Sequence, residues 1–324
     1  MIKIPASCLL LTIAATSAHG IRLQLPSFVF GLMKVGLDMD DTEPSTLYDQ
    51  VCSNLSLWRG LKYTDNEQNV LDVATSPGTS SAPRPVLLFV AGESFANEGT
   101  SVDWEMRQKA ICLSARNGMV GVSMSYRRAP AHNWPAGAQD VAAATSWVRE
   151  NIDLFGGDPH AIVVIGYSVG AFHVATFLAH RELQVADSHI AGAVLLSGIY
   201  SPEADADRGE RAYLGADTTL YKARSAFPGI FEVEEPIVLA WSTLDSPGLV
   251  AQAENLDKRL CGAGHCPRTA LLAGRDSPAS VFGLDATDKA LAGQMRELNR
   301  IPLILKHSLR ERNSWRIRLG LVVG

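Results

Sequence analysis

Ser168 is the residue of this chain whose surroundings point most directly to chemistry. It lies at the centre of Gly166-Tyr167-Ser168-Val169-Gly170, directly after the apolar run 161–165 and directly before an alanine-rich stretch. Glycines on both sides allow a sharp turn between a strand and a helix, so the hydroxyl projects above the sheet edge. Backbone N–H groups at the start of the following helix then face any negative charge that forms there. The pattern predicts a nucleophilic serine; the alternative is a serine that only caps the helix.

Strand-like and helical segments alternate around this turn. Continuous apolar runs occur at 86–90, 120–125, 161–165, 190–196, 236–241 and 269–273, and helical patterns at 102–117, 137–151, 171–181 and 286–300. Continuous apolar runs indicate strands that are covered on both faces, and repeated strand–helix order is typical of a parallel sheet between helices. The sequence therefore predicts a doubly wound α/β fold, preceded by an edge hairpin over 63–73.

The chain is long enough for one large α/β domain, which we expect to span 21–300. Within it, 200–235 is rich in charges and glycines, which indicates an insertion too polar for the core and suited to a lid over the site. The segment 301–324 is basic. We expect it to be a solvated tail, with a membrane-surface helix as the alternative.

The N-terminus predicts export. Lys3 precedes a short apolar run at 8–15 and the small residues at 16–18, which is the pattern of a secretory signal peptide ending near residue 20. We therefore expect a secreted or lumenal protein. Outside the signal, the chain holds an even number of cysteines, as suits an oxidising compartment: Cys52, Cys112, Cys261 and Cys266. The last two could close a small loop with a disulfide bond, because the glycines between them make the loop flexible; a metal site is the alternative, although the spacing is not that of a zinc site.

Composition excludes several other classes of function. Apolar residues make up 47% of the chain and charged residues 19%, as in an ordinary globular protein. A net charge of −5 gives no electrostatic reason to expect nucleic acid as a partner. No apolar run is long enough to span a bilayer, and neither a phosphate-binding glycine loop with lysine nor a metal-spaced histidine pair is present. We therefore expect a small-molecule substrate without metal or cofactor, and the oligomeric state stays open.

The order of several motifs resembles the α/β-hydrolase superfamily, especially its secreted carboxylesterase, feruloyl-esterase-like and hormone-sensitive-lipase-like branches. The similarity covers about 63–298. Its most specific portion reads Ser125-Tyr126-Arg127-Arg128-Ala129-Pro130, Trp134-Pro135-Ala136, Asp140-Val141, Trp147, Glu150-Asn151, Phe155-Gly156-Gly157-Asp158-Pro159 and the Ser168 turn. A later match is Tyr213-Leu214-Gly215-Ala216-Asp217. The resemblance implies the α/β-hydrolase fold with a lid insertion.

In this family a serine attacks an ester carbonyl, a histidine takes its proton and an acid orients the histidine. The resemblance places the acid at Asp245, in Trp241-Ser242-Thr243-Leu244-Asp245-Ser246-Pro247 after the seventh strand; a turn-capping aspartate is the alternative. It places the oxyanion-binding N–H groups at Gly92, Glu93 and Val169. The family begins that loop with His-Gly-Gly, whereas this chain has Ala91-Gly92-Glu93, so a carboxylate is added where negative charge would form.

The family's histidine follows the eighth strand, and at that place this chain has Ser277, beside Arg275 and Asp276. Four histidines are candidate substitutes. His265 precedes the strand and so belongs at its other end, His307 lies in the tail, His173 lies inside the helix after Ser168, and His132 lies near the lid. A general base must come within hydrogen-bond reach of the serine.

Three functions therefore fit the sequence. The first is a secreted serine hydrolase of the carboxylesterase type that acts on small or aryl carboxylic esters. The second is a non-hydrolytic enzyme of the same fold, a cofactor-free lyase, dehydratase or cyclase, which would use Glu93 and Asp276 as acid and base. The third is a catalytically impaired binding protein, because the fold hosts many roles.

Overall fold

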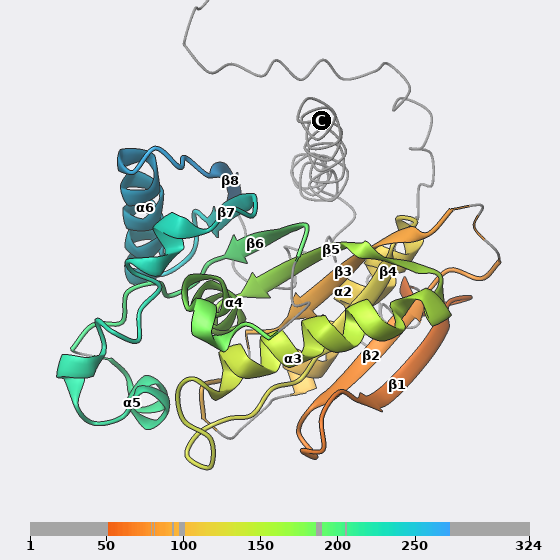
Figure 1. Ribbon diagram of the computed structural model, residues 1–324, viewed down its shortest axis with the longest axis horizontal. Helices are drawn as coiled ribbons and strands as arrows, with labels where there is room; N and C mark the ends of the chain where they lie inside the picture. The colour runs from red at the N-terminus through yellow and green to blue at the C-terminus, as the bar shows by residue number, and fades with distance from the viewer. Residues whose placement is uncertain are drawn as a thin grey trace, which may run out of the picture. The chain divides into compact units, whose positions relative to one another are not determined.

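An eight-stranded sheet forms the centre of the protein (Figure 1). The computed structural model describes residues 51–272, apart from 79, 81, 93, 97–100, 186–189 and 205. The strands are β1 (Ser56–Lys62), β2 (Val70–Thr75), β3 (Arg84–Val90), β4 (Val120–Met124), β5 (Gly157–Tyr167), β6 (Gly192–Leu196), β7 (Ile237–Ser242) and β8 (Arg268–Leu272). Their order across the sheet is β1-β2-β4-β3-β5-β6-β7-β8. The expected signal peptide (1–20), helix 286–300 and tail (301–324) lie outside the described residues.

The sheet is parallel from β4 to β8, and only β2 runs antiparallel to its two neighbours. All six predicted parallel strands are present, each displaced by only a few residues. The predicted edge hairpin is also present, but it spans 56–75 rather than 63–73: β1 ends at Lys62, before the predicted range begins, and β2 ends at Thr75. The doubly wound α/β fold is thereby confirmed.

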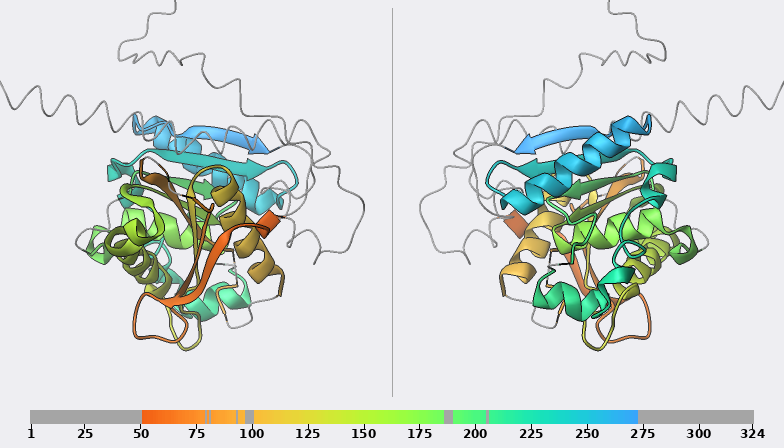
Figure 2. Two further views of the ribbon diagram at one scale, coloured as in Figure 1. Left: turned by 90° about the vertical axis from the view of Figure 1, so that its right-hand side faces the viewer. Right: turned by 90° about the vertical axis from the view of Figure 1, so that its left-hand side faces the viewer.

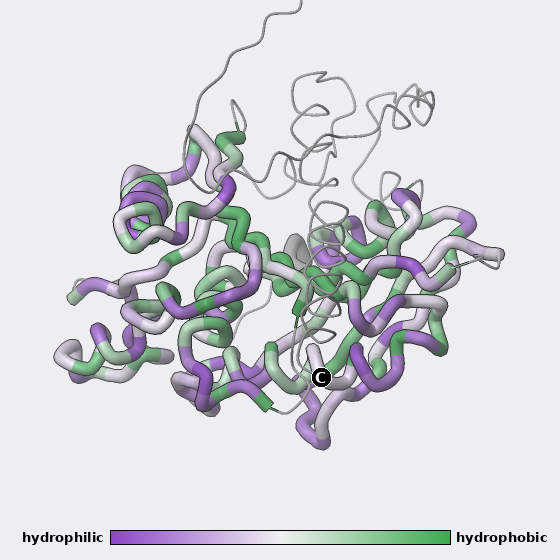
Figure 3. Tube along the Cα trace, turned by 45° about the horizontal axis from the view of Figure 1, so that its top comes forward, coloured by the Kyte–Doolittle hydropathy of each residue, from purple (hydrophilic) through white to green (hydrophobic). Residues whose placement is uncertain are grey.

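Helices cover both faces of this sheet (Figure 1). The predicted helices are α2 (Ser101–Arg116), α3 (Ala136–Asn151) and α4 (Val169–Ala179). Side chains of α3 and α4 pack into the larger of two main cores, and α2 packs on the opposite face. Green segments in Figure 3 follow the central strands, and purple segments lie at the periphery, as expected when a sheet is buried on both faces.

The helix α6 (Pro247–Gly262) was not predicted, although the sequence carries its start signals. Ser246 accepts a hydrogen bond from the Leu249 N–H, and proline occupies the first turn, which are both common at helix N-termini. Its buried residues are Ala253, Leu256 and Leu260, which share one helical face. This helix packs alongside β7, as Figure 2 shows.

Disulfide bonds join both pairs of the expected cysteines. Cys52, just before β1, is bonded to Cys112 of α2, so the start of the described chain is attached to the helix on that face. Cys261 and Cys266 close the loop between α6 and β8, as their spacing predicts. The first bond closes a much longer loop, and it therefore removes more conformational freedom from the unfolded chain.

The insertion 200–235 differs from expectation. It holds α5 (Arg208–Leu214) and two short 3-10 helices, η4 (Thr218–Leu220) and η5 (Gly229–Glu232). Its large side chains are buried in the main core rather than solvated: Tyr200, Tyr213, Leu214, Tyr221 and Ile230. The prediction that this segment is too polar for the core is wrong, because tyrosines bury their rings while their hydroxyls find partners. A lid role for it stays a prediction.

Candidate active site

Ser168 lies between β5 and α4 in a backbone conformation that only a tight turn requires. Its φ is +52° and its ψ is −117°, which is a strained conformation for a residue other than glycine. The serine is the N-cap residue of α4, yet its side chain makes no capping hydrogen bond. Ser168 is half-buried, and its hydroxyl does not cap the helix. The prediction of a turn that presents this serine is confirmed, and the capping alternative is wrong.

Close packing explains the last glycine of the motif. A Cβ on Gly170 would collide with the carbonyl oxygens of Val90 and Ala91 at the end of β3. Only a residue without a side chain lets the first turn of α4 approach β3 this closely. The N-terminus of α4 is thereby held above the carboxyl ends of β3 and β5.

Gly92 brings the loop after β3 against the serine. A Cβ on Gly92 would lie 2.7 Å from the Ser168 Cβ and 2.5 Å from the Tyr167 Cδ1. The preceding carbonyl, that of Ala91, accepts a hydrogen bond of 3.1 Å from the buried Tyr126 hydroxyl. The predicted oxyanion residue Gly92 therefore lies beside Ser168, while Glu93 lies outside the described residues.

Val169 supplies a second main-chain donor at the same place. It is the first residue of α4, and the N–H groups of a helix's first turn have no acceptor within the helix. The positive end of the helix dipole adds to their attraction for an anion. An oxyanion that forms on a substrate bonded to Ser168 would meet this end of α4.

Asp245 lies in the turn after β7 and is held by two hydrogen bonds to one of its oxygens. Its Oδ2 accepts a bond of 2.6 Å from the Ser197 hydroxyl and one of 2.8 Å from the Ser242 N–H. Sequence analysis did not identify Ser197, because this residue follows β6 rather than β7 and is part of no recognised motif. Asp245 itself is half-buried.

Sheet register brings these residues to one edge. Tyr167 of β5 is paired with Leu196 of β6, which is paired with Ala240 of β7. The Ser168 N–H continues this ladder with a 2.9 Å bond to the Leu196 carbonyl. Ser168, Ser197 and the Asp245 turn therefore follow three adjacent parallel strands at their carboxyl ends, where open α/β sheets place their binding sites.

His173 is fully enclosed and does not reach the serine. Its ring lies among four aromatic rings, those of Phe95, Tyr126, Phe172 and Tyr213, with centroid distances of 4.5 to 5.8 Å. Neither ring nitrogen has a hydrogen-bond partner. Burial, with a smaller contribution from the Arg128 charge, lowers the pKa of His173 to about 3. This imidazole is a neutral core side chain.

Two other candidate substitutes, His265 and His132, lie within the described residues. His265 is exposed and precedes β8, at the opposite end of the strand from Asp245, as predicted. His132 is half-buried in the connection between β4 and α3. Ser277 and His307 lie outside the described residues. Among the residues that the structure describes, no histidine is hydrogen-bonded to Ser168 or Asp245.

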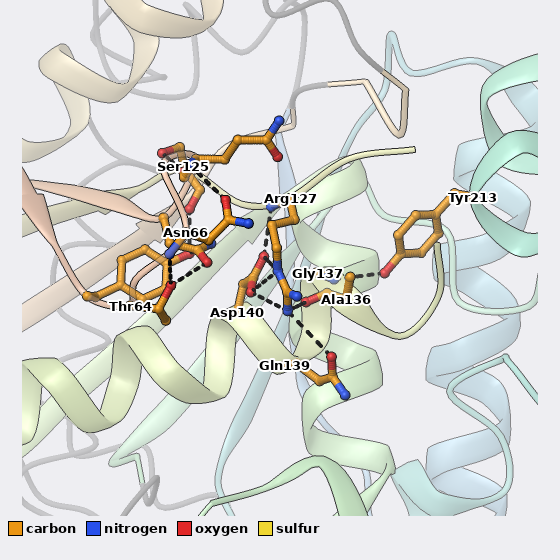
Figure 4. A network of polar contacts seen from close by, with 12 residues as sticks. Thr64, Asn66, Ser125, Arg127, Ala136, Gly137, Gln139, Asp140 and Tyr213 are labelled. Atoms are coloured by element: carbon orange, nitrogen blue, oxygen red, sulfur yellow. Dashed lines mark hydrogen bonds and ion pairs between the residues drawn. The ribbon is translucent and has the colours of Figure 1, made fainter. Parts of the chain in front are cut away.

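An ion pair between the half-buried Arg127 and the buried Asp140 fixes the connection from β4 to α3 (Figure 4). The Asp140 carboxylate accepts bonds from the Arg127 main-chain N–H at 2.7 Å and from its Nε at 2.8 Å. The Arg127 Nη2 also lies 2.8 Å from the same carboxylate. At the other side of α3's first turn, the Gly137 N–H donates to the Tyr213 hydroxyl of α5 at 2.9 Å. The start of α3 is therefore bonded both to the connection after β4, through Asp140, and to the insertion, through Gly137.

Within the described ranges, no group of three or more histidine, cysteine, aspartate or glutamate side chains could hold a metal ion. In the same part of the chain, no helix is both long and apolar enough to cross a membrane.

Comparisons with known proteins agree with this geometry. A family model described as the alpha/beta hydrolase fold matches residues 80–245, just over half of the chain. Esterase LipC of Mycobacterium tuberculosis is 36% identical over 112 residues, which are 35% of this chain and 27% of that protein. Para-nitrobenzyl esterase of Bacillus subtilis is 31% identical over 155 residues, or 43% of this chain and 31% of that protein. The chain thus spans well under half of either relative.

The solved structure of esterase B from Lactobacillus rhamnosis superposes with a TM-score of 0.69 at 16% identity, covering 84% of this chain and 93% of that one. At this identity the likeness concerns the fold. The resemblance to the carboxylesterase and hormone-sensitive-lipase-like branches is nevertheless confirmed by the esterases among the relatives. From its sheet order, its serine turn and the matching family model, this chain belongs to the α/β-hydrolase fold family.

Proposed function

We propose that this protein is a carboxylic ester hydrolase in which Ser168 is the nucleophile and Asp245 the acid. The observation that carries the proposal is the Ser168 turn: a strained serine whose hydroxyl caps nothing, at the N-terminus of α4 and against Gly92. Backbone strain of this kind persists at functional sites, where the surrounding structure maintains it. The esterases among the relatives support the same activity.

In the proposed reaction, the Ser168 Oγ attacks the ester carbonyl carbon while its proton passes to a base. Negative charge moves to the carbonyl oxygen, where the N–H groups of Gly92 and Val169 stabilise it. The C–O bond to the alcohol then breaks, the alcohol leaves with a proton, and the acyl group stays on Ser168. Water attacks this acyl-enzyme, which releases the carboxylic acid and restores the serine.

We propose that the base lies outside the described residues, because no described histidine is hydrogen-bonded to Ser168 or Asp245. The Leu272 carbonyl at the end of β8 accepts a bond of 2.9 Å from the Thr243 N–H, so the last described residue lies beside the turn that holds Asp245. After β8 the sequence holds one histidine, His307. Replacing His307 with alanine tests whether it is this base: its removal is then expected to lower the rate by about three orders of magnitude or more.

We propose small or aryl esters as the substrate class and the secretory route as the location. One relative is named para-nitrobenzyl esterase, which supports esters with an aromatic group as substrates. The two disulfide bonds support an oxidising compartment, because such bonds are rare in reducing ones.

Labelling with a fluorophosphonate probe tests the proposal. We expect an adduct on Ser168, located by peptide mass spectrometry, together with turnover of p-nitrophenyl butyrate. Both are lost in Ser168→Ala and kept in Ser80→Ala, which changes an exposed serine. Wild-type protein without an adduct overturns the nucleophile assignment. An adduct without turnover of a panel of esters overturns hydrolysis and leaves a non-hydrolytic enzyme or a binding protein.

A further inference from the structure

Ser197 is a buried serine next to the candidate acid. It follows β6 directly and is only 3% exposed. Its hydroxyl donates to the Asp245 Oδ2 at 2.6 Å, a length typical of an O–H bond to a charged carboxylate. The Ser242 N–H donates to the same oxygen at 2.8 Å. Two donors therefore hold the carboxylate by Oδ2.

The backbone at Ser197 indicates that the hydroxyl matters. Its φ is +48°, a left-handed conformation that favours glycine and is unfavourable for serine. The Ser197 N–H keeps its place in the sheet through a 2.9 Å bond to the Ala240 carbonyl. Glycine would adopt this backbone conformation without strain. We therefore expect a role of the Ser197 side chain that offsets the strain.

The next residue supplies a useful contrast. A Cβ on Gly198 would lie 2.6 Å from the Ala171 Cβ of α4, so packing alone explains that glycine. The chain thus has glycine where α4 approaches and serine where the backbone is left-handed. Within the described part of the chain, the Ser197 hydroxyl has a single hydrogen-bond partner, the Asp245 carboxylate.

We infer that Ser197 is a positioning residue for the candidate acid. Its hydroxyl, with the Ser242 N–H, fixes the plane of the Asp245 carboxylate by Oδ2, so that Oδ1 is directed to the base that takes the Ser168 proton. This inference rests on the proposed ester hydrolysis. A purely structural bond, one that only ties the end of β6 to the turn after β7, would stabilise the fold without affecting the orientation of the base.

Two variants separate these roles. Ser197→Gly removes the hydroxyl and relieves the left-handed backbone, while Ser197→Asn keeps a side-chain donor in a residue that tolerates this conformation. For Ser197→Gly we expect kcat for p-nitrophenyl butyrate to fall about ten- to a hundredfold with KM unchanged, because a misdirected base loses rate rather than affinity. The urea midpoint should not fall to the same extent, since strain is lost together with the bond. Ser197→Asn should recover part of kcat.

The pH profile gives a second readout. The acid limb of kcat/KM should move in Ser197→Gly, since it reports the protonation of the base that Asp245 orients. A kcat within twofold of wild type, with an unmoved profile, overturns the inference while Ser168 labelling still supports hydrolysis. A fall in kcat that the urea midpoint follows, without recovery in Ser197→Asn, also overturns it. Wild-type protein that is neither labelled nor active overturns the proposed function, and the positioning role falls with it.

Discussion

The buried imidazole of His173 makes the stability of this protein sensitive to mild acid. Its pKa is lowered from an ordinary value of 6.5 to about 3, first by burial and then by the charge of Arg128. The unfolded chain therefore binds a proton on this residue between pH 6.5 and pH 3 that the folded chain does not. Stability is fully present above pH 6.5 and is lost as the pH falls through this window. Tyr213 also faces the ring, and burial raises its pKa further above the ordinary value, so it stays neutral in this window.

The magnitude follows from the two pKa values. Linkage between protonation and folding gives a loss of about 2 kcal/mol in the free energy of unfolding from pH 7 to pH 5 for this group alone. That is a large share of the ~5–15 kcal/mol by which domains are stable. In His173→Leu the loss from pH 7 to pH 5 should shrink by the same amount, because leucine carries no titratable group.

Urea denaturation followed by tryptophan fluorescence at the two pH values measures this difference. His265→Ala is the matched control, since His265 is exposed and its removal should leave the pH dependence unchanged. His173→Met serves as a second replacement of similar volume if leucine impairs folding. Equal losses of stability in wild type and in both His173 variants would show that the imidazole is not the group that titrates.

Three further predictions concern the site and its supports. Asp140→Asn should lower the free energy of unfolding by about 1–3 kcal/mol in a chemical denaturation experiment, because the half-buried Arg127 loses its charged partner but keeps contact with water; an unchanged midpoint would contradict this account of the pair. Gly92→Ala should lower kcat for p-nitrophenyl butyrate by about a hundredfold, because the new methyl group displaces Ser168 or the loop, and wild-type activity would show that the loop has room. Under oxidising conditions, Cys52→Ala should lower the free energy of unfolding by about 2–4 kcal/mol relative to wild type. Under reducing conditions, the variant and the wild type should be equally stable.

The sheet and the serine turn could be predicted from the sequence because their signals are local. Apolar runs of strand length specify strands buried on both faces. The glycines around Ser168 specify the turn without any contribution from distant segments. The resemblance to a known family then supplied Asp245, which its own surroundings would not distinguish from a capping aspartate. The structure places it at the same sheet edge as Ser168.

Contacts between distant segments could not be predicted in the same way. Ser197 becomes informative only because β6 lies between β5 and β7, so that its hydroxyl meets Asp245. The insertion was judged by its charges, whereas its burial depends on tyrosines such as Tyr200 and Tyr213, each with a polar tip on an apolar ring. For α6, the start signal at Ser246 was present in the sequence, but this signal does not predict which face of the helix packs against β7.

The stacking of Tyr213 on Phe95 links two regions that are often considered separately. Their ring centroids are 5.2 Å apart with planes 28° from parallel, and Phe95 belongs to the loop that begins at Gly92. An engineer who transplants the insertion from a relative would also change the aromatic ring against which the loop after β3 packs. The two regions therefore need to be exchanged as a pair, with both rings taken from the same parent.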